Sequence, residues 1–155
     1  MIMKTRKATK KDLEAILALS DLMVKFHTNF DPYYAIYTKY EDPKEFYKKQ
    51  LAKKNTLYVV TENDKKEIVA FASAYIISIP KAKAPSIGVL VANFVKEKYR
   101  GMGIGTKQFT YRIDWLKRHH VKYVEMNVDA RNKKALALWK KYGFKDYQVK
   151  LKIDL

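Results

Sequence analysis

The stretch Tyr99-Arg100-Gly101-Met102-Gly103-Ile104-Gly105-Thr106 joins a run of apolar residues to an amphipathic helical pattern. Three of the five glycines in the chain fall within five residues of this stretch. Glycine has no Cβ atom, so several backbone N–H groups can approach one ligand closely. The helix that follows adds partial positive charge at its N-terminus. The stretch therefore predicts a turn that binds an anionic group such as phosphate.

The pattern on either side of this turn predicts strands and helices in alternation. Residues 87–95 are almost all apolar, which is typical of a central strand covered on both faces. After the turn, an apolar stripe predicts a helix over about 103–119, and residues 121–128 predict another strand. A short helix follows, with Asn132 as its N-cap and Gly143 just beyond its end.

The last nine residues, 147–155, alternate apolar and polar side chains throughout. A strict period of two is typical of a strand with one buried face. We therefore predict a half-buried strand here. At the edge of a sheet it could pair between two copies of the chain, so a homodimer is one expected assembly.

The first half of the chain predicts strands, helices and a hairpin. By residue number, these elements are a strand at 2–6, a helix at about 10–26 capped by Thr9, a helix opened by Glu41, Asp42 and Pro43 and running to about 53, antiparallel strands at 57–61 and 68–79 around a polar turn, and a loop at 80–85. Together they predict one domain over residues 1–155 of the α/β class. Its sheet is mixed and mostly antiparallel, with helices on both faces.

The segment at 27–37 is rich in aromatic residues but has no clean period. Asp31 precedes Pro32, which disfavours helix at Asp31, so we predict a loop or a broken helix. Such a segment either lines a binding site or forms a lid that packs its rings on the core.

The chain carries 32 Lys and Arg against 16 Asp and Glu, a formal charge of +16. This charge attracts anions from a distance. It is compatible with nucleic acid, an acidic membrane surface or a polyphosphate cofactor, and equally with a lysine-covered surface that binds nothing.

Composition excludes several classes of site. The chain has no cysteine, which rules out disulfides, zinc–cysteine sites and thiol nucleophiles within it, and its three histidines are too few and too poorly spaced to predict a metal site. We find neither the apolar core of a signal peptide nor a run near the roughly 20 apolar residues of a membrane span. We therefore expect a cytoplasmic protein with no metal and no membrane partner.

The spacing of the glycines distinguishes between the known kinds of phosphate-binding turn. A Walker loop needs Gly-Lys-Ser/Thr, but here Gly105, Thr106 and Lys107 have the reverse order. A dinucleotide fingerprint needs Gly-x-Gly-x-x-Gly, which is absent. The spacing that fits is Arg-x-x-Gly-x-Gly at Arg100, Gly103 and Gly105. It resembles the acetyl-coenzyme A signature of the GNAT superfamily of N-acetyltransferases.

Two further stretches carry the same resemblance. Arg6-x-Ala8-x-x-x-Asp12-Leu13-x-x-Ile16 is similar to the opening strand and helix of the family. Asn132-x-x-Ala135-x-x-x-Trp139-x-x-x-Gly143-Phe144 is similar to its second cofactor motif. The three stretches occur in the family's order and cover most of the chain, which implies a GNAT fold.

The resemblance implies that acetyl-CoA is the cosubstrate. The pyrophosphate would bind the turn, and the pantetheine arm would bind the strand before it, where a backbone N–H would also polarise the thioester carbonyl. Asn132 could equally serve only as a helix cap. The implied cofactor-binding residues are Phe94, Val95, Arg100, Gly101, Met102, Gly103, Ile104, Gly105, Thr106, Asn132, Ala135 and Trp139.

The implied reaction is direct attack of a primary amine on the thioester. An amine with a pKa near 10.4 must first lose a proton, to a carboxylate or to ordered water. Asn93 is no carboxylate, so Glu125 is the candidate base, unless it is only a surface or ion-paired residue. Trp139 occupies the position at which many family members have a tyrosine that acts as the general acid. An indole N–H cannot deliver a proton in its place. Tyr142 is the nearest hydroxyl, three positions further along the helix.

The acceptor side is expected to include His27, Asp31 and Tyr34, from the aromatic segment. The acceptor itself is expected to be a small-molecule or peptide amine. Two other functions stay open: a basic nucleic-acid-binding module, and a coenzyme A sensor of the same fold that lacks turnover.

Overall fold

The computed structural model describes residues 2–37, 42–83 and 86–155, and its strands form one five-stranded sheet. The strands lie in sequence order across the sheet. They are β1 (Lys4–Lys7), β2 (Thr56–Glu62), β3 (Ile68–Ser78), β4 (Ser86–Val95) and β5 (Tyr123–Met126). Every neighbouring pair is antiparallel except β4 and β5, which are parallel. The predicted mixed, mostly antiparallel sheet is confirmed.

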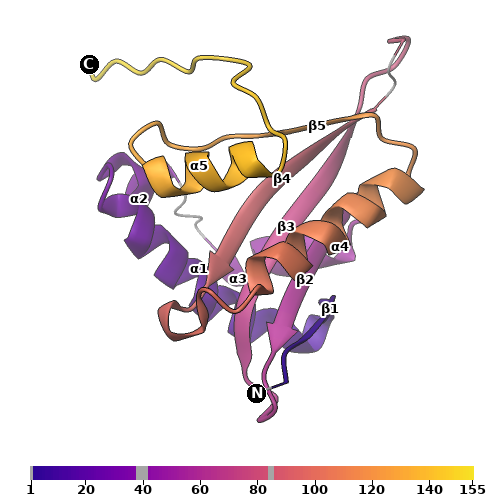
Figure 1. The fold of residues 1–155 in the computed structure, drawn as a ribbon, viewed down its shortest axis with the longest axis vertical. Coiled ribbons are helices and arrows are strands. Elements are labelled where there is room, and N and C mark those ends of the chain that lie inside the picture. The colour runs from indigo at the N-terminus through magenta and orange to yellow at the C-terminus, as the bar shows by residue number, and fades with distance from the viewer. Residues whose placement is uncertain (1, 38–41, 84–85) are drawn as a thin grey trace.

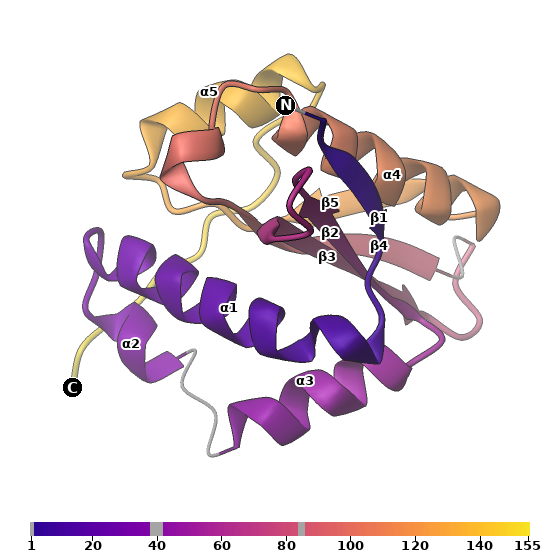
Figure 2. The ribbon, with the colours of Figure 1, turned by 90° about the horizontal axis from the view of Figure 1, so that it is seen from below.

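Helices cover both faces of this sheet, as predicted (Figures 1 and 2). One face carries α1 and α3, and the other carries α4 and α5. The helices are α1 (Leu13–Thr28), α2 (Tyr33–Tyr37), α3 (Pro43–Ala52), α4 (Ile104–Arg118) and α5 (Lys133–Lys141), with single 3-10 turns η1 (Lys10–Asp12) and η2 (Glu97–Tyr99).

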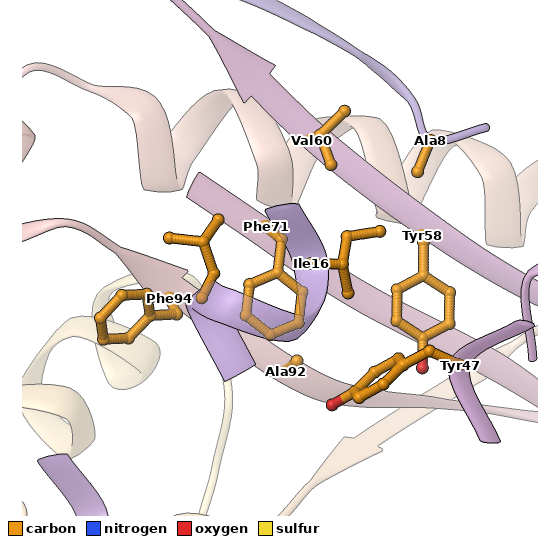
Figure 3. Close-up of a cluster of buried hydrophobic side chains, with 9 residues drawn as sticks. Ala8, Ile16, Tyr47, Tyr58, Val60, Phe71, Ala92 and Phe94 are labelled. Atoms are coloured by element: carbon orange, nitrogen blue, oxygen red, sulfur yellow. The ribbon is translucent and has the colours of Figure 1, made fainter. Parts of the chain in front are cut away.

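The core beneath α1 and α3 is built from aliphatic and aromatic side chains (Figure 3). Ile16 of α1 and Phe71 of β3 are fully buried. Tyr47 of α3 packs edge-on against Tyr58 of β2, and its hydroxyl bonds the hydroxyl of Ser20 at 2.6 Å. This bond satisfies two buried polar groups and fixes α3 against α1.

The start of the chain is tied to the sheet through Arg6. Its guanidinium donates to Asp12 at 2.8 Å and to Glu62 at 3.0 Å. The hydrogen bonds from Arg6 hold the pKa of Asp12 below its usual range. Two of the residues that carry the family resemblance, Arg6 and Asp12, therefore join β1 to the first turn that leads into α1.

The helix predictions hold with shifted ends. The predicted helix at 10–26 starts as the 3-10 turn η1 and continues as α1 to Thr28. The second helix starts at Pro43, where the Asp42 side chain accepts from the Glu45 N–H at 2.9 Å, while Glu41 lies outside the described residues. Positions 84–85 of the predicted loop also lie outside them. In the aromatic segment the helical structure is broken, because α1 ends at Thr28 and α2 begins at Tyr33.

The prediction of a half-buried strand at 147–155 is wrong. These residues have no regular secondary structure, and the apolar side chains at Tyr147, Val149, Leu151 and Ile153 are 80% exposed or more. A period of two makes a strand only where a sheet edge is available to pair with it. Within the described chain this segment, which we call the C-terminal tail, pairs with none.

Candidate active site

The stretch from Tyr99 to Thr106, which we call the glycine turn, leads into the N-terminus of α4 and is open on one side. Gly101 and Gly103 have φ angles of +78° and +74°, and Gly103 is the N-cap of the helix. A side chain avoids these angles, which is why glycine stands at both positions. A Cβ atom built at Gly101, Gly103 or Gly105 would meet nothing within 4 Å. The turn therefore borders open space, with the first N–H groups of α4 at its end.

Two side chains anchor the turn to the sheet. The ring of Tyr99 is buried, and its hydroxyl accepts from Asn63 at 3.1 Å. Arg100 folds back on β4, since its Nε donates to the Val95 carbonyl at 3.0 Å. Its guanidinium lies 5.5 Å from the ring centre of Phe26 and 6.0 Å from that of Phe94. The turn thus carries a cation held in a fixed place.

The hydroxyls of Thr106 and Tyr142 lie 2.6 Å apart and join the first turn of α4 to the end of α5. The Tyr142 ring stacks on Phe109 with centres 4.4 Å apart. Trp139 is buried beside them, in edge contact with Phe109 and Phe144. Tyr142 therefore lies at the glycine-turn end of α4.

Strand β4 carries a bulge where it leaves β5. Leu90 pairs with Ala74 and Asn93 with Ala72, so two residues of β4, Val91 and Ala92, lie opposite one residue of β3. The register with β5 ends at Leu90, and Figure 1 shows the chain after β5 running on toward α5. A bulge re-aims the strand that contains it. Val91 is 59% exposed although β4 is an inner strand.

The bulge is held from inside the core by Arg112 of α4, which is fully buried. Its Nη1 donates to the carbonyls of Ser73 at 3.2 Å and Ala92 at 3.1 Å. Its Nη2 donates to Oδ1 of Asn93 at 2.8 Å. Burial lowers the pKa of Arg112 to about 10, which still leaves it protonated at neutral pH. A buried cation with neutral oxygen partners thus fixes the shape of β4.

Sequence reasoning missed Arg112, although a signal was present. Ile104, Gln108, Arg112 and Leu116 follow one another at intervals of four, and all four are buried. A polar residue in phase with a buried helical stripe faces the core.

The predicted acceptor residues His27, Asp31 and Tyr34 are brought together, and two residues from the segment after β5 join them. The Tyr34 hydroxyl donates to Asp129 at 3.0 Å. Arg131 donates to Asp129 at 2.7 Å and to Asp31 at 3.2 Å. The hydrogen bonds from Arg131 hold the pKa of Asp129 far below its usual range, so this carboxylate stays ionised.

His27 lies beside this cluster, with its ring centre 5.3 Å from that of Tyr34. Its Nδ1 is buried and has no hydrogen-bond partner among the described residues. Burial lowers the pKa of His27, which keeps the imidazole neutral at neutral pH. A neutral imidazole offers an acceptor nitrogen.

The other predicted residues are more widely placed. Glu125 is exposed on β5. Asn132 caps α5, and its side chain accepts from the Ala135 N–H at 3.1 Å. Phe94 is buried at the end of β4, facing the core beneath α1. Met102 is half exposed in the turn.

A cavity of about 460 Å³ lies between α1 and the glycine turn. Its lining combines apolar side chains with three cations and one carboxylate. The lining residues are Leu22, Lys25, Phe26, Asn29, Phe94, Lys96, Glu97 and Arg100.

Residues 2–37, 42–83 and 86–155 lack two kinds of feature. This part of the chain holds no group of three or more His, Asp or Glu side chains placed to bind a metal ion. It also contains no helix with the length and apolar character needed to cross a bilayer.

Comparison with known proteins gives consistent matches. The model of the acetyltransferase (GNAT) family matches residues 20–144. The uncharacterized N-acetyltransferase MJ1207 of Methanocaldococcus jannaschii is 30% identical over 146 residues, which are 93% of this chain. The chain spans 61% of the length of that relative.

Solved structures share the fold. A tetramutant of the BH1408 protein from Bacillus halodurans superposes with a TM-score of 0.83 at 21% identity, over 100% of both chains. A predicted acetyltransferase from Clostridium acetobutylicum, solved with acetyl-CoA, has a TM-score of 0.77 at 17% identity, over 99% of this chain and 96% of that one. At such identities the likeness shows the fold alone.

Proposed function

The chain belongs to the acetyltransferase (GNAT) family, and from that premise we propose that it transfers the acetyl group of acetyl-CoA to a primary amine. The observation that carries the proposal is the open turn at Gly101, Gly103 and Gly105, which ends on the N-terminus of α4. Backbone N–H groups and the helix dipole at such an end favour a pyrophosphate.

The cosubstrate is proposed to extend from this turn along β4. Arg100 and the N–H groups of residues 101–106 would bind the pyrophosphate, with the hydroxyls of Thr106 and Tyr142 beside it. The pantetheine arm would lie against Phe94 and Val95, where β4 has separated from the segment after β5. Ala135, Asn132 and Trp139 of the α5 region would border that space. The bulge held by Arg112 supports this role because it directs β4 away from β5.

His27 is the base we favour for the acceptor amine. Its imidazole is neutral, and Nδ1, which has no hydrogen-bond partner in the part of the chain that the structure describes, can take the ammonium proton. Asp129 is a poorer base, because its bonds to Arg131 and Tyr34 keep its pKa far below the usual range. Glu125 stays the second candidate, because it is a carboxylate exposed on β5.

The reaction then balances without a metal. The free amine attacks the thioester carbon, a backbone N–H of β4 stabilises the oxyanion, and the carbon–sulfur bond breaks as the amide forms, with the second proton of the attacking nitrogen passing to solvent. The thiolate leaves without an acid, because a thiol pKa near 8.5 makes it a modest base. Tyr142 is then a cofactor-binding residue, since its hydroxyl is engaged by Thr106.

Release of the coenzyme A thiol, measured with a panel of polyamines, peptides with free lysine and amino sugars, tests this function. Amine-dependent release in at least one class is expected. Saturable acetyl-CoA binding with no release across the panel would instead identify a coenzyme A sensor. Salt-sensitive binding of DNA or RNA that acetyl-CoA leaves unchanged would favour the nucleic-acid module.

A further inference from the structure

We propose that Lys152 of the C-terminal tail occupies the position of the acceptor ammonium and is the first amine that the site acetylates. Acetylation would remove the charge of Lys152 and open that position to the lysine side chain of another molecule. The inference rests on the acetyl transfer proposed above. It adds an acceptor class, the lysine side chain, and a modification site within the chain itself.

The tail lies against the segment that carries the predicted acceptor residues. Residues 144–155 have no regular secondary structure, and Figure 2 shows this part of the chain ending beside α2. Nζ of Lys152 donates to Oδ2 of Asp31 at 3.2 Å and lies 4.9 Å from the ring centre of Tyr33, the first residue of α2. A primary amine of the chain itself is therefore held in the acceptor region.

The groups around this amine form one connected cluster. Arg131 donates to the same oxygen, Oδ2 of Asp31, at 3.2 Å and to Asp129 at 2.7 Å. Tyr34 links the same two segments, since its hydroxyl donates to Asp129 at 3.0 Å. Asp129 and Arg131 belong to the segment after β5, which borders the space proposed for the pantetheine arm. Lys152 therefore shares a carboxylate oxygen with a residue of the segment beside the proposed acyl donor.

The charges of the cluster indicate that a cation is favoured at the position of Lys152. Within the described residues, the carboxylates Asp31 and Asp129 pair with the cations Arg131 and Lys152. If Lys152 loses its charge, two carboxylates face a single cation. The cluster then attracts an ammonium group, although the chain as a whole carries +16. An acceptor ammonium and Lys152 therefore compete for Asp31.

The ion pairs of Lys152 keep its amine in the charged form. Nζ lies 3.2 Å from a carboxylate oxygen of Asp154, in the tail, and 3.2 Å from one of Asp31. Its hydrogen bonds to Asp154 and Asp31 raise the pKa of Lys152. An ammonium has no lone pair with which to attack a carbonyl, so Lys152 occupies the position as a cation and reacts slowly. Transfer to other amines is therefore expected to begin with a lag.

Acetylation of Lys152 follows the same steps as the proposed reaction. Its ammonium loses a proton to His27, and the flexible four-carbon stem lets the amine leave Asp31 and attack the thioester carbon. The carbon–nitrogen bond forms, the carbon–sulfur bond breaks, and the second proton of the nitrogen passes to solvent. The product is a neutral amide, which lacks the charge-assisted bond to Asp31. The acceptor position is then open.

The first test maps acetylation by mass spectrometry after wild type is incubated with acetyl-CoA and no other amine. Lys152 is expected to be acetylated before the other lysines, at a rate per chain that does not depend on protein concentration. Lys145, exposed just before the tail, reports uncatalysed acetylation. Gly105→Val, which fills the proposed pyrophosphate site, should make Lys152 as slow as Lys145. Equal rates for the two lysines in wild type, or a rate per chain that rises with protein concentration, would overturn the proposal.

The second test measures thiol release with Nα-acetyl-lysine amide as the acceptor. Lys152→Arg keeps a cation that can pair with Asp31 but cannot be acetylated, whereas Lys152→Gln resembles the acetylated side chain. KM for the acceptor should be several-fold lower for Lys152→Gln than for Lys152→Arg, with similar kcat. Wild type should start at the rate of the arginine variant and accelerate to that of the glutamine variant. Lys145→Gln, which removes the same charge from an exposed position, should behave as wild type.

Failure of this inference differs from failure of the proposed function. Thiol release with equal KM values for Lys152→Gln and Lys152→Arg would overturn the role of Lys152 and leave acetyl transfer in place. No thiol release with any amine, together with no acetylation of Lys152, would remove the proposed function and this inference with it. Because the Lys152 side chain is 42% exposed, both substitutions should leave the fold intact, as circular dichroism melts check.

Discussion

The guanidinium of Arg112 donates to the backbone carbonyl of Ala92 at 3.1 Å, from the centre of α4 to the bulge of β4. This bond links the helix that begins at the glycine turn to the point where β4 leaves β5. Both halves of the proposed acetyl-CoA site therefore depend on one buried side chain, which also contacts Ser73 and Asn93.

Arg112→Met should destabilise the fold. It removes the guanidinium donor from the buried carbonyls of Ser73, Ala92 and Gln108, and an unsatisfied buried acceptor costs about 1–3 kcal/mol. Urea unfolding of the variant measures the loss. Arg118→Met on the exposed part of the same helix is the control and should stay within about 0.5 kcal/mol of wild type. Equal stability of Arg112→Met and the control would show that the bulge needs no such clamp.

Tyr142→Phe should weaken acetyl-CoA binding more than it slows turnover. The change removes the hydroxyl that bonds Thr106 and keeps the ring stacked on Phe109. We expect KM for acetyl-CoA to rise several-fold with kcat nearly unchanged. Steady-state kinetics at saturating amine separates the two constants. A large fall in kcat at unchanged KM would instead make Tyr142 the acid that protonates the thiolate.

Because of His27, the free energy of unfolding and the activity should both fall as the pH is lowered. Burial lowers its pKa in the folded protein below the unfolded value of about 6.5. Its neutral form therefore favours the fold, and this contribution is complete above about pH 6.5 and is lost as the pH falls through the lowered folded pKa. Thermal melts should show wild type losing stability below pH 6.5 and His27→Gln losing less.

The same variant tests the proposed base. His27→Gln should lower kcat/KM and remove the acid limb of its pH profile. Glu125→Gln serves as the comparison. If Glu125→Gln removes that limb and His27→Gln does not, the base is Glu125.

Much of the fold was predictable because its signals are local. The period of 3.6 in α1 and α4, the apolar run of β4 and the cluster Gly101, Gly103 and Gly105 each specify structure within a few residues. The family resemblance at Arg100, Gly103 and Gly105 was confirmed by the family match.

The features that escaped prediction depend on distant partners. Tyr34 and Asp129 are 95 residues apart in sequence, so neither predicts the other. The tail alternates as a strand does, yet pairing depends on an edge that no local pattern reveals. Arg112 is polar, and only its phase with Ile104 and Leu116 shows that it faces inward.

The central claim is that the turn from Tyr99 to Thr106 binds acetyl-CoA, and titration calorimetry of wild type and Gly105→Val tests it most directly. Gly105 has an ordinary φ angle and open space above its Cα, so valine there is compatible with the fold. Thr110→Val, exposed on the same helix, is the matched control.

We predict saturable binding of acetyl-CoA to wild type and to Thr110→Val. Binding to Gly105→Val should be at least tenfold weaker at unchanged melting temperature, because the valine side chain fills the space that the pyrophosphate needs. A tenfold loss of affinity corresponds to about 1.4 kcal/mol of binding free energy. Equal affinity of Gly105→Val and wild type, or no saturable binding to wild type, would contradict the claim.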